Sequence, residues 1–215
     1  MKLHRPAIGL LLLTATSLFA ADTVKVDFAD WDHSLWRPVR EARFPVIVPF
    51  VQRAGYLENL IPLGADEKDI IAAKDGMGVA IMLRRDFCAA DVTLRASMAF
   101  ARKGAPAIIF RVQRQEDIAG DMYSLVLYAE GLNLWKFSGG KWSKVGASKF
   151  EVAPRDFHDV RLFARGGDFT VFLDGQKKLL CSDPQPLGPG EVGLWSGEGP
   201  CFFSIFLAKP LASKR

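Results

Sequence analysis

The chain has few of the residues that build metal centres and disulfide frameworks. Among 215 residues there are three cysteines and three histidines. Only His33 and His158 lie beyond residue 20, far apart and without the cysteine or carboxylate spacing that would complete a zinc site. The cysteines, Cys88, Cys181 and Cys201, allow one bridge plus a free thiol, or three buried thiols. We expect no essential disulfide, because Cys201 opens an apolar run in which a free cysteine packs as a small hydrophobe.

The chain also lacks a strong excess of charge of either sign. It has 28 Lys and Arg against 24 Asp and Glu, and Lys2 and Arg5 belong to the leader described below, which leaves 26 basic side chains in the remainder. Solvated strand or loop positions explain the basic pairs Arg84–Arg85 and Lys177–Lys178, and no basic helix accompanies them. The sequence therefore argues against a nucleic-acid partner.

A long apolar run is missing as well. Crossing a bilayer takes about 20 apolar residues, whereas the run that follows Lys2 and Arg5 covers only residues 8–20 and ends in small residues. A basic start, a short apolar run and a small-residue end form the layout of a secretory signal peptide. We expect residues 1–20 to be such a signal peptide, cleaved near Ala20. The product is then secreted or periplasmic, without a membrane span or a lipid-accepting cysteine.

What the chain does have is apolar side chains, at 49%, and aromatic side chains, at 11%. This composition excludes general disorder and suits one packed domain. We expect the core of the domain over residues 76–209, with 21–75 as N-terminal strands and a wrapping segment, and 210–215 as a tail. Within the wrapping segment, Asp66–Lys74 is where a short helix is expected.

Short alternating runs separated by turn residues dominate the chain after Asp91. In His158–Cys181, the dipeptides Gly166-Gly167 and Asp174-Gly175 separate three such runs. Both dipeptides tolerate the positive φ values of tight hairpins, so this stretch predicts a three-stranded antiparallel meander. Similar runs continue to Ala208, roughly a dozen in all, without a fixed repeat and with almost no helix. The expected fold class is all-β, a two-sheet antiparallel β-sandwich.

A row of polar and aromatic residues lies opposite the more apolar row of these runs. It contains Arg95, Arg111, Tyr128, Glu130, Trp135 and Arg161. Saccharides are typically bound by an aromatic ring on the apolar face of a pyranose, with planar charged groups bonding to the hydroxyls. On this ground Arg111 is the first candidate ligand-binding residue and Trp135 the second, followed by Arg95, Tyr128 and Arg161. The alternative is that Tyr128 and Trp135 are core residues and the arginines a solvated face.

No expected strand interior carries the paired carboxylates that hydrolysis of a glycosidic bond requires. Retaining enzymes hold two carboxyl groups about 5 Å apart, which on one strand means two residues apart. A pair assembled from different strands stays open, with Asp121, Glu130 and Asp174 as candidate catalytic residues. Asp174 also has an ordinary role in shaping its turn.

The densest group of ligand-type side chains is Asp30-Trp31-Asp32-His33. Calcium binds loop carboxylates of this kind, although Asx turns before Pro38 explain the segment equally well. Calcium stays an alternative here, and we expect no resident metal and no other cofactor.

Three segments together resemble a known superfamily. They are IIFRVQRQEDIAGDMYSLVLYAEGLNLWKFSGGKW, FHDVRLFARGGDFTVFLDGQKKLL and GPGEVGLWSGEGPCFFSIFL. Their order and spacing resemble the concanavalin A-like lectin/glucanase superfamily and, more narrowly, exported bacterial laminin-G-like and keto-disaccharide hydrolase-type domains. The resemblance covers roughly residues 91–208. It implies a jelly roll of roughly a dozen strands with a concave sheet that faces carbohydrate.

The chain departs from this pattern at several points. Phe157 stands where these domains usually have Trp, and the last run, Phe-Phe-Ser-Ile-Phe, lacks an acidic or asparagine residue. The Glu-x-Asp-x-x-Glu-like strand of glucanases is absent, which argues against a glucanase. We therefore favour an exported carbohydrate-associated binding domain without catalysis. The alternatives are a glycoside hydrolase acting on a (keto-)disaccharide and an envelope protein-interaction module.

Overall fold

The computed structural model describes residues 22–44, 47–61 and 79–212. The expected signal peptide over residues 1–20 and the expected helix over Asp66–Lys74 lie outside these ranges. The described residues form seventeen strands and two 3-10 helices, η1 (Phe28–Asp30) and η2 (His33–Leu35). The strands are β1 (Val24–Asp27), β2 (Trp36–Glu41), β3 (Phe50–Arg53), β4 (Tyr56–Asn59), β5 (Ala80–Ala89), β6 (Val92–Phe100), β7 (Ala105–Val112), β8 (Arg114–Gln115), β9 (Ile118–Ala119), β10 (Met122–Tyr128), β11 (Gly131–Ser138), β12 (Lys141–Lys149), β13 (His158–Arg165), β14 (Asp168–Leu173), β15 (Gln176–Ser182), β16 (Gly190–Gly197) and β17 (Cys201–Pro210).

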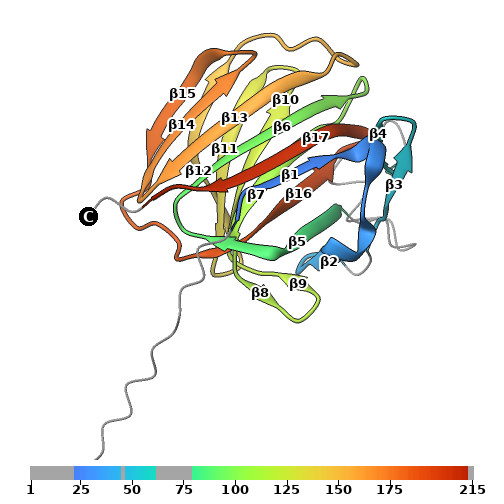
Figure 1. Cartoon of the computed structure of the whole chain (residues 1–215). Helices are drawn as coiled ribbons and strands as arrows, with labels where there is room; N and C mark the ends of the chain where they lie inside the picture. The colour runs from blue at the N-terminus through green and yellow to red at the C-terminus, as the bar shows by residue number, and fades with distance from the viewer. Residues whose placement is uncertain (1–21, 45–46, 62–78, 213–215) are drawn as a thin grey trace, which may run out of the picture.

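The strands form two sheets that lie one behind the other as curved layers (Figure 1). The eight-stranded sheet has the order β15-β14-β13-β6-β17-β4-β3, with β1 also paired to β17. The nine-stranded sheet has the order β12-β11-β10-β7-β16-β5-β2-β9-β8. Pairing in the described strands is antiparallel except between β2 and β9. The predicted two-sheet β-sandwich with little helix, a concanavalin A-like jelly roll, is confirmed.

The predicted meander is present as β13, β14 and β15. Its two turns contain the positive φ values that their sequences allow, with Gly166 at 54° and Asp174 and Gly175 at 49° and 79°. The strand β14 pairs over its length with β13 on one side and with β15 on the other. The alternation in β13 holds, because Val160, Leu162 and Ala164 are buried between the sheets, whereas the residues between them are exposed.

The nine-stranded sheet is buried on both faces over part of its area. Its inner face contributes to the core between the two sheets, as Ile108 and Phe110 of β7 do. Its outer face carries a second apolar cluster, in which Phe44 and Ile61 pack with Ile109. Every residue of β7 is buried as a result. A strand covered on both faces loses the alternation between apolar and polar residues, since neither face meets water.

Alternation fails at Arg111. Strict alternation over residues 107–113 predicts Arg111 on the outer face, beside Ile109. Instead Arg111 has a φ of 51°, and the register between β7 and β16 shifts between Glu191 and Gly193. This β-bulge turns Arg111 to the inner side and places Val112 in the outer cluster. The assignment of Arg111 to the outer row is therefore wrong.

Cys88, Cys181 and Cys201 are free thiols. Burial raises the pKa of each, to about 11 for Cys181. The Sγ atom of Cys181 lies close to Gly146 on β12, where an added Cβ would be 2.7 Å away. This thiol therefore fills space between the edge strands of the two sheets.

Candidate functional site

A cleft of about 210 Å³ lies on the outer face of the nine-stranded sheet. Three of the five tryptophans of the chain line it. The lining residues are Arg43, Ser124, Val126, Tyr128, Trp135, Trp142, Trp195 and Glu198. They come from β10, β11, β12 and β16, from the turn after β16 and from the segment after β2.

The cleft exists because the middle of this outer face is built from small residues. Strand β7 places Ala105 and Ala107 there, where they pack with Val126 of β10. On one side Trp195 of β16 pairs with Ala107, and on the other side Trp135 of β11 pairs with Ser124 of β10. Three inter-strand steps separate β16 from β11, roughly 14 Å in a sheet. The two tryptophans therefore lie on either side of small residues, of which Ser124 and Val126 of β10 line the cleft.

Cations lie against two of the aromatic rings. The Nζ atom of Lys144 is 4.7 Å from the ring centroid of Trp135, and the guanidinium carbon of Arg43 is 5.8 Å from that of Trp142. Such contacts hold an aromatic ring in place as well as neutralising part of its negative face. Lys144 of β12 thus holds the ring of Trp135 on β11, and Arg43, which follows β2, holds the ring of Trp142 on β12.

The charges at the cleft are balanced. Arg43 donates from Nε to Oε1 of Glu41, whose side chain is 0% exposed. The second carboxylate, Glu198, belongs to the lining. Two cations, Arg43 and Lys144, thus face two carboxylates, and the cleft does not carry a strong charge of one sign.

Two of the tryptophans in the lining have an indole N–H group without a hydrogen-bond partner among the described residues. The Nε1 atoms of Trp142 and Trp195 are buried and have no hydrogen-bond partner within the described part of the chain. An unpaired buried donor costs about 1–3 kcal/mol, and such groups are rare in folded proteins. The positions of both rings are therefore maintained by packing and not by a hydrogen bond from Nε1.

Of the predicted ligand-binding residues, the structure brings Tyr128 and Trp135 together in the cleft. Arg95 and Arg161 lie elsewhere, on the outer face of the eight-stranded sheet, where they pair directly across β6 and β13. Both donate from Nε to the carboxylate of Asp159. The sequence pattern identifies the face of a strand on which a residue lies, but it does not tell which of the two sheets holds the strand.

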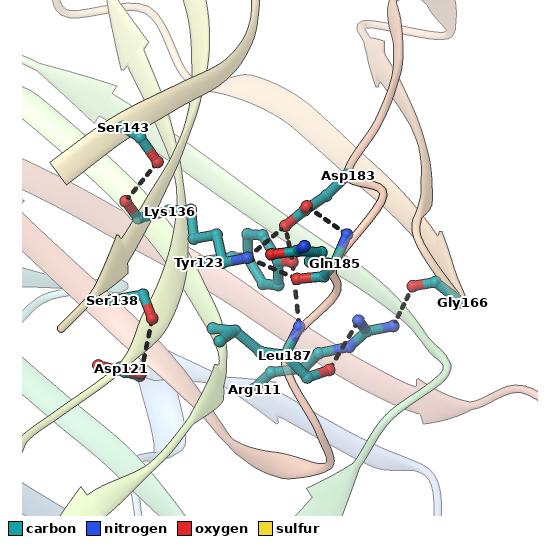
Figure 2. Close-up of polar contacts among 10 residues, drawn as sticks. All are labelled: Arg111, Asp121, Tyr123, Lys136, Ser138, Ser143, Gly166, Asp183, Gln185 and Leu187. Atoms are coloured by element: carbon teal, nitrogen blue, oxygen red, sulfur yellow. Dashed lines mark hydrogen bonds and ion pairs between the residues drawn. The ribbon is translucent and has the colours of Figure 1, made fainter.

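Arg111 lies at one end of the sandwich, where it is 1% exposed (Figure 2). Its Nε donates to the carbonyl of Ala90 at 2.7 Å, Nη1 to Leu187 at 3.1 Å and Nη2 to Gly166 at 2.7 Å. Burial lowers the pKa of the guanidinium. Because these carbonyls belong to three separate loops, Arg111 ties the loops together, and it does not reach the cleft.

A second buried polar group lies beside Arg111 and is drawn in Figure 2. The Oδ2 atom of Asp183 accepts from the hydroxyl of Tyr123 at 2.5 Å and from Nζ of Lys136 at 2.8 Å. Burial opposes ionisation of Asp183, but these bonds and one from the amide of Gln185 hold its pKa below the ordinary value. Burial and the bond to Asp183 raise the pKa of Tyr123. The group fastens residues 183–187 to the inner face of β10 and β11.

The three candidate catalytic carboxylates do not meet. Asp121 and Glu130 lie beyond opposite ends of β10, a seven-residue strand that spans roughly 24 Å. Asp121 accepts from the hydroxyl of Ser138 at 2.8 Å and from the amide of Gly139 at 3.0 Å.

Asp174 belongs to a turn of the eight-stranded sheet. It accepts from the amide of Asp159 and contacts Nδ1 of His158, each at 2.8 Å. Burial opposes ionisation of Asp174, but these bonds lower its pKa. Asp121 and Asp174 therefore both hold turns, and the carboxylate in the cleft is Glu198.

The acidic segment near residue 30 forms local turns. Asp32 accepts from both the amide and the hydroxyl of Ser34, at 2.9 and 2.7 Å, as in the Asx turn that is the alternative to calcium binding. Within residues 22–44, 47–61 and 79–212, no three side chains of His, Cys, Asp or Glu are grouped closely enough to hold a metal ion.

Sequence reasoning missed six of the lining residues. They are Arg43, Ser124, Val126, Trp142, Trp195 and Glu198. For Trp195 a signal exists, because Val192 and Leu194 take the inner positions of β16 and leave Trp195 between glycines on the outer side. An aromatic residue in the outward position of a strand is a site candidate, since it has no place in the core between the sheets. For Arg43 no such pattern exists, because it follows β2 in an irregular segment.

No family model and no curated protein sequence matches the chain. Solved structures do. A carbohydrate-binding module, CBM66, from Bacillus subtilis matches with a TM-score of 0.64 at 17% identity, over 81% of this chain and 95% of its own. A Bacillus licheniformis beta-glucanase gives 0.64 at 10% identity, over 90% and 99%. A prokaryotic beta-1,3-1,4-glucanase (lichenase) derived from a mouse hindgut metagenome gives 0.63 at 13%, over 88% and 100%.

Within the described residues, no helix is long and apolar enough to cross a membrane.

At identities of 10–17%, the solved structures establish the architecture, which agrees with the strand order and the two packed layers. The chain has the concanavalin A-like jelly-roll fold.

Proposed function

We propose that this chain is an exported saccharide-binding domain whose ligand occupies the tryptophan-lined cleft. The observation that carries the proposal is the gathering of Trp135, Trp142 and Trp195 with Tyr128 around one recess. Aromatic side chains offer large apolar faces, and they suit a ligand that is apolar on one side and polar on the other. The carbohydrate-binding and glucanase structures of the same fold are consistent with this ligand class.

The polar groups of the cleft favour an uncharged ligand. Ser124, Arg43 and Glu198 offer hydroxyl, guanidinium and carboxylate groups for bonds to sugar hydroxyls. The balance of charge between Arg43, Lys144 and the two carboxylates gives no preference for an anionic or a cationic group. A volume of about 210 Å³ is below the roughly 300–1,000 Å³ of pockets for drug-sized molecules, so one or two sugar rings fit better than a long oligosaccharide.

Binding is favoured over hydrolysis because one carboxylate, Glu198, belongs to the lining. The neighbouring Glu41 is fully buried and pairs with Arg43. Glycosidases of the usual type need two carboxyl groups on either side of the scissile bond. Export is part of the proposal on the strength of the basic and apolar leader over residues 1–20.

Calorimetric titration tests the proposal. Protein without residues 1–20 is titrated with a panel of neutral mono- and disaccharides, and Trp135→Ala is expected to weaken the binding at least tenfold, about 1.4 kcal/mol. Phe163→Ala is the matched control, because Phe163 is an aromatic residue 40% exposed on the outer face of the other sheet. We expect this control to bind as the parent protein does. Absence of binding across the panel, or equal losses in the two variants, would contradict the proposal.

A second measurement separates binding from catalysis. Prolonged incubation with the saccharide that binds is followed by quantification of newly formed reducing ends, for the parent protein and for Glu198→Gln. We expect no release in either case. Release by the parent that is lost in Glu198→Gln would establish the hydrolase alternative.

A further inference from the structure

Trp195 leans along its own strand and covers Gly197. A Cβ atom built on Gly197 would lie 2.6 Å from Cη2 of Trp195 and 3.2 and 3.3 Å from Cζ3 and Cζ2. Residues two apart on a strand point to the same face and are about 6.8 Å apart. The far end of the indole therefore reaches along β16 as far as the next residue on the outer face, and the ring stays low against the sheet.

The backbone of Gly197 does not require glycine. Its φ lies outside the positive range that favours glycine, unlike that of Gly199 at 135°. The contact that excludes a side chain is made with the tip of the Trp195 ring, and real Cβ atoms do not approach other heavy atoms within 3.0 Å. Glycine is therefore required at position 197 to leave room for the indole ring of Trp195. Ala105, the partner of Gly197 on β7, keeps the neighbouring floor equally low.

The low position of the ring is not favoured by hydrogen bonding. Nε1 of Trp195 is buried without a partner in the described part of the chain, at a cost of about the size of one hydrogen bond. A ring that rose from the sheet would approach water and could bond to it. Trp195 remains low because Gly197 leaves room beneath it and because Ala107 and Val126 pack at its side.

We propose that Gly197 is a positioning residue that sets the height of the Trp195 indole and thereby the depth of the cleft. The inference rests on the proposed function and deepens it: the low indole forms part of the floor, and a neutral pyranose lies over it with its C–H face toward the ring. A methyl group at position 197 lifts the indole into the space that the sugar takes. The fold tolerates this change, because the atoms displaced belong to the end of one side chain rather than to the backbone.

The test compares two Gly→Ala variants. Gly197→Ala is expected to weaken saccharide binding in calorimetry at least tenfold and to have the same midpoint of urea unfolding as Gly188→Ala. Gly188→Ala is the matched control, because a Cβ there has nothing within 4 Å and the φ of Gly188 is not positive. Both substitutions alter the unfolded chain in the same way, so the difference between them reports on the cleft. Equal affinities of Gly197→Ala and Gly188→Ala would overturn the inference.

A smaller ring at position 195 removes the contact that excludes a side chain at position 197. In a Trp195→Phe background the ring no longer reaches residue 197, so Gly197→Ala is expected to cost less than twofold in affinity there. This non-additivity is the sign of direct contact between two residues. An undiminished loss in the Trp195→Phe background, or a fall in unfolding midpoint that parallels the loss of binding, would show that Gly197 acts through the fold.

A readout without ligand keeps the inference separate from the proposed function. Lifting the indole changes its exposure, so Gly197→Ala is expected to increase acrylamide quenching of tryptophan fluorescence relative to Gly188→Ala. The increase is expected to vanish in the Trp195→Phe background. If no saccharide binds the parent protein, the proposed function fails while this result still decides the positioning role. Identical quenching in the two glycine variants overturns that role.

Discussion

On the inner face of β7, β10 and β11, polar side chains find partners inside the protein, whereas on the outer face of the same strands they surround a recess. Arg111, Tyr123 and Lys136 bond to carbonyls and to Asp183 at the end of the sandwich. Tyr128 lies on the same strand as Tyr123, and Trp135 is next to Lys136. Both Tyr128 and Trp135 line the cleft. The two regions contain the same kinds of residue, aromatic and cationic, on neighbouring backbone.

The comparison shows that residue type does not distinguish a structural group from a binding site. The inner group is closed, because the guanidinium of Arg111 and the carboxylate of Asp183 are matched by protein atoms. The outer group keeps about 210 Å³ of space and two indole donors that have no hydrogen-bond partner among the residues that the structure describes. The inner polar group and the outer cleft therefore differ in two respects: whether their hydrogen bonds are satisfied and whether space is left between the side chains.

The comparison would be broken most directly at Arg111. Arg111→Ala is expected to lower the free energy of unfolding by about 3–5 kcal/mol, because it removes three hydrogen bonds of a charged donor and leaves a cavity where the buried side chain lay. Urea unfolding followed by circular dichroism measures the loss. Arg161→Ala, on the outer face of the eight-stranded sheet, serves as control and is expected to change it by less than about 0.5 kcal/mol. A loss below about 1 kcal/mol for Arg111→Ala would refute the structural role.

The next effect is expected at Asp183. Asp183→Asn is expected to lower the free energy of unfolding at pH 7 by about 2 kcal/mol, since the charged acceptor of Lys136 and Tyr123 is lost. Although burial opposes ionisation, hydrogen bonds from Lys136, Tyr123 and Gln185 hold the pKa of Asp183 in the folded protein below its ordinary value. Its contribution is therefore complete above that value and disappears as pH falls through the lower folded pKa.

Urea unfolding of the parent and of Asp183→Asn at several pH values checks the sign. The difference in stability between the two proteins is expected to be largest near neutral pH and to shrink below about pH 4. A difference that is independent of pH would mean that the charge of Asp183 does not contribute.

The smallest effect is expected on the outer face. Lys144→Ala removes the cation 4.7 Å from the ring of Trp135 and is expected to lower the free energy of unfolding by about 0.5 kcal/mol. The effect on saccharide affinity is expected to be larger than that on stability, because Trp135 loses a group that holds its ring. Paired calorimetry and urea unfolding measure both, and a loss of stability comparable to that of Arg111→Ala would contradict the division between the two faces.

Much of the architecture follows from the sequence because hairpins are encoded locally. In β13 to β15 the turn dipeptides and the alternation of three short runs are sufficient to give strands and order. Arg111 could not be placed in this way. A β-bulge depends on how β7 pairs with β16, about 80 residues further along the chain, and no residue near Arg111 signals it.

The cleft was predictable only in part. Tyr128 and Trp135 lie close together in sequence and on adjacent strands, so the pattern of one hairpin relates them. Trp195 joins them because β16 pairs with β7, a neighbour in the sheet that is not a neighbour in sequence. Arg95 and Arg161 have the same kind of alternation as Trp135 but belong to the other sheet. The assignment of strands to sheets is decided by packing of the whole chain.

Arg43 belongs at once to residues 42–44, which follow β2 and pack on the outer face of the nine-stranded sheet, and to the lining of the cleft. Its neighbour Phe44 packs in the cluster beneath that segment, while its guanidinium lies over Trp142. A ligand that contacts Arg43 would therefore add to the interactions that hold residues 42–44 against this face. By thermodynamic linkage, a ligand that binds only the folded protein at this position would raise its stability in proportion to the logarithm of the ligand concentration.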